Sequence, residues 1–140
     1  MAKQMKTHGL LIVALVVWAV TGCASQGVQK KLTAADAGLL PGTWGGTVNP
    51  PGTTGMVPAS LTIRPDGTYS TDAGAFSSSG KAEIKDGFVQ FISTAATGPI
   101  NVGDRAGSAV LMDRDTSWAL VGSGHASIGG PFSFEFTKKK

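Results

Sequence analysis

The sequence predicts an all-β fold: a single small antiparallel up-and-down β-barrel of about eight short strands, with a short helical turn before the first strand. Beyond Gly42 no segment keeps a helical period for about 11 residues, and the recurrence of Gly, Ser, Thr and Pro disfavours long helices. Short segments that alternate apolar and polar residues recur instead, separated by turn sequences. A closed barrel is favoured over an open sheet because it leaves no exposed edge strand.

The helical turn is expected directly before the barrel. Thr33 and Asp36 have the spacing of a capping box, and Pro41 and Gly42 end any helix that begins there. One or two helical turns fit this segment. The first strand is then expected at 43–48.

Three hairpins follow the first strand. In the first two, the turn contains Asp-Gly, a pair that readily adopts the positive φ angles of tight turns; in the third, a charged corner marks the turn. We expect the strand pairs at 61–63 with 68–71, 81–84 with 88–92, and 108–112 with 117–121.

The last strand, 131–136, has phenylalanine at every second position, so these rings line one face of the sheet. The alternation in the other strands predicts the remaining inward side chains. The predicted core consists of Trp44, Leu61, Ile63, Tyr69, Ile84, Val89, Phe91, Leu111, Trp118, Leu120, Phe132, Phe134 and Phe136.

The first 22 residues have the layout of a secretory signal. Lys3, Lys6 and His8 give a basic start, and an uncharged apolar run of 12 residues follows over 9–20. A helix that spans the hydrocarbon core needs about 20 residues. The run can therefore engage an export channel but is a poor permanent membrane span.

The segment Val20-Thr21-Gly22-Cys23 resembles the lipobox of bacterial lipoproteins. The resemblance implies cleavage between Gly22 and Cys23, a thioether-linked lipid on Cys23, and acylation of the new amino terminus, with palmitate as the expected acyl group. Ala24 and Ser25 lack the aspartate that implies inner-membrane retention in enterobacterial lipoproteins, so the outer membrane is favoured in a cell with two membranes. The alternative is a buried free cysteine beside an ordinary cleavage site.

These features divide the chain into three parts. Residues 1–22 are the signal peptide that is removed, 23–32 are the lipidated amino terminus and a flexible tether, and 33–138 are the barrel domain. Several acyl chains on one cysteine would turn marginal membrane contact into stable anchoring. We therefore expect a cell-envelope protein held on a membrane by covalent lipid.

The charge of the exported chain argues against a nucleic-acid partner. Lys3 and Lys6 lie in the predicted signal, so 10 of the 12 basic residues remain against 9 acidic ones, and the exported protein is nearly neutral. A nucleic-acid site needs basic residues clustered on one face or stripe. Only 30–31 and 138–140 cluster, and we interpret both as solvated ends.

Gly42-Thr43-Trp44, at the head of the predicted meander, resembles the start of lipocalin and wider calycin barrels. In those barrels the tryptophan packs across the closed end, and the resemblance assigns this place to Trp44. The chain departs from the family because it has no Thr-Asp-Tyr motif, no cysteine pair, and no arginine in the last strand, where lipocalins carry one against the tryptophan. Strands of about seven residues reach only about 23 Å, so side chains are expected to fill much of the barrel.

The sequence contains no reactive constellation, and we expect no enzymatic activity, no metal and no cofactor. His125 lies in the glycine-rich segment 122–130, which lacks the following helix that a nucleophile elbow or a phosphate loop needs. We interpret the segment as a flexible loop that joins two strands. A metal site of His125 with Asp113 or Asp115 would need further ligands, and the aspartates at predicted turns are interpreted as turn residues.

Two kinds of feature are candidates for binding. Trp44, Tyr69, Trp118 and Phe134 either line a ligand pocket or belong to the core, which is the commoner role of aromatic residues at strand spacing. The two longest loops, 49–58 and 94–107, are the other candidates, because irregular surface segments often carry function.

The leading hypothesis is a noncatalytic, monomeric envelope lipoprotein that binds a protein or a small apolar ligand through its loops or a shallow pocket. The first alternative is an inhibitor of an envelope or host hydrolase, a protease or lysozyme, because small calycin-like barrels and other small envelope lipoproteins serve bacteria in this way. The second alternative is a hydrolase that uses His125.

Overall fold

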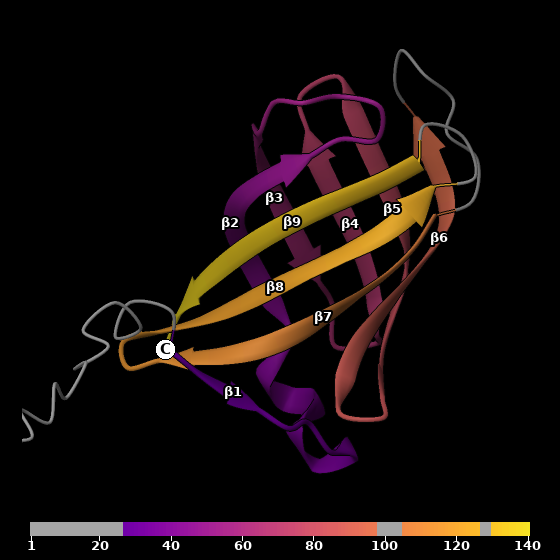
Figure 1. Cartoon of the computed structure of the whole chain (residues 1–140). Coiled ribbons are helices and arrows are strands. Elements are labelled where there is room, and N and C mark those ends of the chain that lie inside the picture. The colour runs from indigo at the N-terminus through magenta and orange to yellow at the C-terminus, as the bar shows by residue number, and fades with distance from the viewer. Residues whose placement is uncertain (1–26, 98–104, 127–129) are drawn as a thin grey trace, which may run out of the picture.

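The computed structural model describes residues 27–97, 105–126 and 130–140, most of which are in strands (Figure 1). No helix within these three ranges has the length and hydropathy needed to cross a membrane. In chain order the elements are β1 (Val28–Lys30), the 3-10 helix η1 (Ala34–Leu39), β2 (Gly42–Asn49), β3 (Val57–Ile63), β4 (Thr68–Ala73), β5 (Phe76–Lys85), β6 (Phe88–Thr97), β7 (Arg105–Arg114), β8 (Ser117–Ala126) and β9 (Gly130–Lys139).

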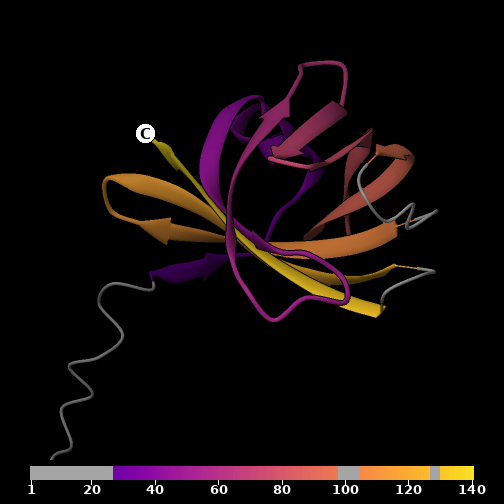
Figure 2. The ribbon, with the colours of Figure 1, turned by 90° about the horizontal axis from the view of Figure 1, so that it is seen from above.

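The strands from β2 to β9 form a closed antiparallel barrel. Each strand pairs with the next along the chain, and β9 pairs back onto β2, from Gly45 opposite Thr137 to Asn49 opposite Ser133. Figure 2 shows these strands curving around a common interior. The predicted all-β, eight-stranded up-and-down barrel is confirmed, and so is the short helical turn before its first strand.

Most strands are longer than the sequence predicts. The last five, β5 to β9, have 10 residues each. The added residues include 76–80 of β5 and 122–126 of β8, which are rich in Gly and Ser and show no apolar alternation. Their backbones nevertheless pair with neighbouring strands.

Two of the predicted loops are therefore corrected. The segment 122–126, predicted as the start of a flexible loop, is strand, and so are 94–97 and 105–107 of the predicted loop 94–107. The loop predicted at 49–58 is shorter, because β2 ends at Asn49 and β3 begins at Val57. The rest of the first two loops, 127–129 and 98–104, lies outside the described residues.

The extra strand, β1, lies beside the barrel rather than in it. It pairs with β7 over Leu111–Asp113, whereas β6 pairs with β7 over Ala106–Ala109. β1 therefore continues the edge of β7 beyond the point where β6 ends, and it covers backbone groups that would otherwise be exposed. Because Leu32 is also only 3 % exposed, residues 28–32 of the predicted tether belong to the folded unit; 23–26 lie outside the described part of the chain.

The tight turns have the chemistry that the sequence predicts. In the two-residue turn between β5 and β6, Asp86 has φ 54° and Gly87 has φ 86°, as a type I′ turn requires. Before β4, Asp66 Oδ1 accepts hydrogen bonds from the backbone N–H of Thr68 at 2.9 Å and from its hydroxyl at 2.6 Å. These aspartates are turn residues, as expected.

The core contains the side chains predicted to point inward. All 13 are buried except Ile84, Trp118 and Phe132, which are partly buried and pack against the core. Leu32 and Leu40, which the strand pattern does not reveal, also belong to it. The core of the described residues lies within Leu32–Phe136, so the chain from residue 24 onward contains all the strands and core residues that the structure describes.

The two ends of the barrel differ. At the closed end, toward the bottom of Figure 1, β1 and η1 lie beside the first residues of β2, with Trp44 fully buried. The open end carries the loop 50–56 and the turn between β4 and β5. In architecture, the chain is thus a small barrel of the lipocalin-like kind.

Candidate functional site

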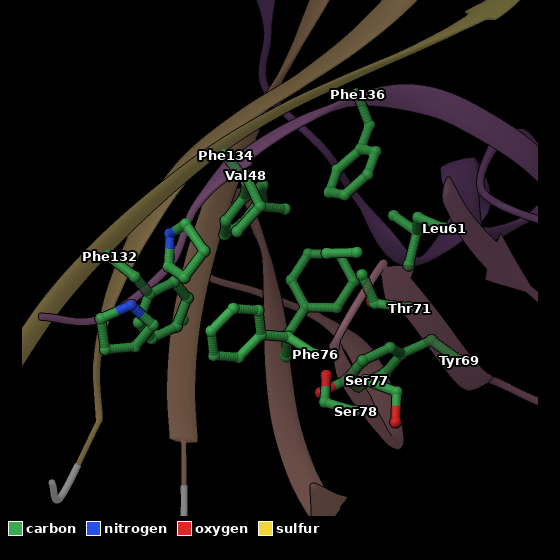
Figure 3. A pocket seen from close by; sticks show the side chains of 15 residues that line it. Val48, Leu61, Tyr69, Thr71, Phe76, Ser77, Ser78, Phe132, Phe134 and Phe136 are labelled. Carbon is green, nitrogen blue, oxygen red and sulfur yellow. The ribbon is translucent and has the colours of Figure 1, made fainter. Parts of the chain in front are cut away.

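A small pocket opens at the open end of the barrel (Figure 3). Its volume is about 70 Å³, well below the roughly 300–1,000 Å³ of pockets that hold drug-sized ligands. The barrel is therefore largely filled by its own side chains, as expected for one of eight strands. The lining residues are Val48, Pro50, Pro51, Leu61, Tyr69, Thr71, Ala73, Phe76, Ser77, Ser78, Phe91, Gly107, Phe132, Phe134 and Phe136.

Aromatic rings from three strands form the floor and one wall of the pocket. Tyr69 of β4 meets Phe91 of β6 edge to face at 5.1 Å, and Phe91 meets Phe134 of β9 in the same way at 5.7 Å between ring centroids. Phe132 stacks on Phe134 at 6.3 Å. This chain of contacts fixes the rings, so the pocket is preformed and apolar.

Glycines on β7 and β8 make room for the two outer rings. Gly122 lies opposite Phe134 in the sheet, and a Cβ at Gly122 would overlap the Phe134 ring at 2.6 Å. A Cβ at Gly107 would lie 3.5 Å from the ring of Phe132. Gly107 and Gly122, which the sequence placed in loops, are therefore packing positions in strands, where a ring of β9 lies over the bare backbone.

Four hydroxyl-bearing side chains line the pocket, those of Tyr69, Thr71, Ser77 and Ser78. Thr71 of β4 and Ser78 of β5 are directly opposite each other and half-buried, and neither hydroxyl has a hydrogen-bond partner within the described part of the chain. None of the lining residues carries a charge. The site can thus offer apolar contact and hydroxyl hydrogen bonds, but no ion pair from these residues.

The four aromatic residues predicted as pocket or core separate into two groups. Tyr69 and Phe134 line the pocket. Trp44 and Trp118 belong to the other end of the barrel: Trp44 is in the second strand beside η1, and Trp118 is next to the turn between β7 and β8. Sequence reasoning missed Thr71, Ser78 and Phe76, because only strand pairing brings them to the same opening.

Trp44 is held by contacts from the chain before and after it. Its indole Nε1 donates a hydrogen bond to the Leu40 carbonyl at 2.9 Å. Lys138 Nζ lies 4.6 Å from the ring centroid and donates to the carbonyls of Leu39 at 2.7 Å and Pro41 at 2.9 Å. Lys138 thus places a cation from the last strand against Trp44, although that strand contains no arginine.

The two lysine clusters were predicted to be solvated ends. This prediction is wrong for Lys30, Lys138 and Lys140, which make specific contacts. Burial lowers the pKa of Lys138 below its ordinary value of 10.5. Lys140 Nζ lies 4.5 Å from the centroid of the Trp118 ring and contacts the carboxylate of Asp113. Lys30 Nζ lies 3.5 Å from Asp36. These contacts tie the last strand and η1 to the closed end.

His125 is placed differently from the sequence interpretation. It is exposed on β8, and its neighbours across the sheet are Ala106 and Pro131, which have no ionisable side chain. Asp113 of β7 is opposite Trp118, and Trp118 lies at the other end of β8 from His125. The considered metal site of Asp113 with His125 is therefore not assembled. Within the described ranges no three His, Cys, Asp or Glu residues are grouped as metal ligands would be.

Comparisons with protein families, with curated proteins and with solved structures gave no significant match to this chain.

Proposed function

We propose that this chain is a noncatalytic lipoprotein of the cell envelope that binds a small apolar ligand at the open end of its barrel. The preformed aromatic pocket, with its rim of hydroxyl groups, is the observation that carries the proposal. Binding of an apolar group against these rings is favourable, because it removes apolar surface from contact with water. The small volume limits the inserted part to a chain end or one edge of a ring.

The lipobox-like segment 20–23 supports lipid anchoring. The small residues that follow it support anchoring in the outer membrane. The first paired residue, Val28, lies opposite Asp113 at the closed end. The chain from Cys23 to Val28 reaches at most about 18 Å, whereas a strand of 10 residues spans about 33 Å. An anchor on Cys23 would therefore hold the closed end toward the bilayer and the pocket away from it.

Binding is tested with the chain from residue 24, whose folding is checked by circular dichroism. A neutral fluorescent probe, N-phenyl-1-naphthylamine, should gain emission on binding to it. Ala73→Leu, which places three added carbons in the pocket, should weaken binding at least about tenfold, and Ala34→Leu on exposed η1 should not. Equal binding by Ala73→Leu would refute the pocket, and so would a folded unsubstituted chain that binds neither this probe nor a short uncharged alkyl chain.

Anchoring is tested with the full chain in a bacterial host. Labelled palmitate should enter the protein, and the protein should fractionate with the outer membrane. Cys23→Ser should abolish both the label and the cleavage that a lipoprotein-specific protease performs, whereas Ser25→Ala should leave both unchanged. Label retained in Cys23→Ser would exclude Cys23 as the attachment site.

Protein binding through the loop 50–56 is a second candidate function. Met56 in this loop is 54 % exposed and lies at the same end as the pocket, where it could contact a partner. The target would be a hydrolase of the envelope or of a host. Inhibition assays on purified proteases and lysozymes test this, and Met56→Ser should relieve any inhibition that is found.

A further inference from the structure

We propose that the pocket selects uncharged ligands that combine a short apolar tail with one hydrogen-bonding head group, such as an alcohol, and rejects the corresponding carboxylates. This inference rests on the proposed ligand-binding function and adds the chemical class of the ligand. It follows from three properties of the described lining: its lack of charge, its pair of hydroxyl groups and its volume.

The lining contains no charged side chain to meet a charged ligand. Asp72 is the nearest charged residue in the β4 sequence, but it lies between Thr71 and Ala73 and is exposed, because successive side chains of a strand point to opposite faces. A carboxylate drawn in among the rings would lose its hydration and find no cation among these residues. An unpaired charge in such surroundings is strongly disfavoured, whereas a hydroxyl is not.

Thr71 and Ser78 supply the matching polar group. As directly opposite residues on neighbouring strands, they have Cβ atoms about 4.5–5.5 Å apart, so one ligand atom can reach both hydroxyls. A hydroxyl donates one hydrogen bond and accepts two. Both side chains are half-buried and lack a partner among the described residues, so a ligand head group can satisfy them without breaking an existing bond.

The volume of about 70 Å³ sets the size of the apolar part. One molecule of liquid water occupies about 30 Å³, so the pocket holds only a few heavy atoms beyond its mouth. Pro50, Pro51 and Phe132 are among the residues that border this space. A straight chain of about six carbons, of which only part enters this space while its head group meets the hydroxyl pair, is a suitable probe.

The experiment compares 1-hexanol with hexanoate at pH 8 by calorimetry or by displacement of N-phenyl-1-naphthylamine from the chain beginning at residue 24. The two probes have the same chain length and differ in the charge of the head group. We expect 1-hexanol to bind at least about tenfold more tightly. Hexanoate binding as tightly as 1-hexanol, or more tightly, would overturn the inference and leave the ligand-binding function standing.

Variants test the role of each group. Thr71→Val keeps the shape of the side chain and should weaken 1-hexanol about three- to tenfold, the effect of one lost hydrogen bond, while Thr62→Val on the outer face of β3 should not. Ser78→Lys should reverse the selectivity in favour of hexanoate, and the control Ser60→Lys on exposed β3 should not. Unchanged selectivity in a folded Ser78→Lys protein would overturn the inference. If neither the dye nor 1-hexanol binds the unsubstituted chain, the proposed function itself fails and the inference with it.

Discussion

Replacing Lys138 by alanine should destabilise the barrel far more than the same change at its neighbour Lys139. Lys138 Nζ donates two hydrogen bonds to carbonyls of the segment 39–41 and lies against the Trp44 ring. Lys139 is exposed. Lys138→Ala therefore removes the contacts that join the last strand to η1, whereas Lys139→Ala removes only a solvated side chain.

The magnitude follows from these contacts. A hydrogen bond from a charged donor contributes about 1.5–3 kcal/mol and a partly exposed cation–π contact about 0.5–1 kcal/mol. The sum is an upper limit for two reasons. In the variant, water can donate to the two carbonyls in place of Lys138, and in the unsubstituted protein the partial burial of the ammonium has a desolvation cost, which also lowers the pKa of Lys138. We expect a loss of about 2–4 kcal/mol for Lys138→Ala, and less than about 0.5 kcal/mol for Lys139→Ala.

The assay is urea unfolding of the chain from residue 24, followed by fluorescence of Trp44 and Trp118, which are both near the closed end. With a denaturant dependence of about 1.5 kcal/mol/M, the midpoint of Lys138→Ala should fall by roughly 2 M. Lys138→Arg keeps a cation and several donors but not the compact ammonium, so its midpoint should lie between those of Lys138→Ala and the unsubstituted protein. Equal midpoints for Lys138→Ala and Lys139→Ala would refute this account of the closed end.

Three further predictions concern single positions. Gly46→Ala should lower the free energy of unfolding by about 2 kcal/mol or more, because its Cβ would overlap the Glu135 carbonyl, whereas Gly45→Ala, with open space around it, should cost less than 1 kcal/mol by the same urea assay. The Thr68 hydroxyl and N–H lower the pKa of Asp66 below 3.8, so its stabilising effect is present above that pH and lost as the pH falls through the folded-state pKa; the urea midpoints of Asp66→Ala and the unsubstituted protein should differ more at pH 6 than at pH 3. Phe132→Ala should enlarge the pocket and shift the alcohol preference toward longer chains in calorimetry, and an unchanged preference would contradict its place in the wall.

The regular parts of the barrel were predictable because side chains and turns agree there. In β9, phenylalanine alternates with polar residues, and the rings at 134 and 136 are buried as that period requires. At residues 86–87, the positive φ angles are those that Asp and Gly adopt most readily. Such local agreement between pattern and turn was enough to give the strand order and thus the closed barrel.

The ends of the strands could not be predicted in the same way, and the pocket lies there. Ser78 and Gly122 have little strand preference of their own. Ser78 is in a strand because it pairs with Thr71 across a turn, and Gly122 because it pairs with Phe134 of the next strand. Tyr69 and Phe134 were identified as candidates from the sequence, but the hydroxyl pair depends on the register between β4 and β5, which residue types alone do not specify.

The contacts of Lys138 were hidden for a related reason. Three lysines at the end of a chain usually form a solvated tail, and the carbonyls that receive the Lys138 hydrogen bonds are 97 and 99 residues earlier. Neither the carbonyls nor their direction can be inferred from the residue types. The resemblance to lipocalins pointed to a cation against Trp44, but not to a lysine as its source.

If the proposed function holds, the two ends of the barrel divide stability and binding between them. The pairs Lys30–Asp36 and Lys140–Asp113 and the contacts of Lys138 are at the closed end, whereas the lining of the pocket at the open end is uncharged. The closed-end contacts and the pocket lining share no residue, and substitutions at distant sites without shared partners usually act independently. Lys138→Ala should accordingly leave the affinity for 1-hexanol unchanged in native buffer, and Thr71→Val should weaken that affinity with little change in the urea midpoint. Coupling of the two effects in either variant would show that the ends are not independent.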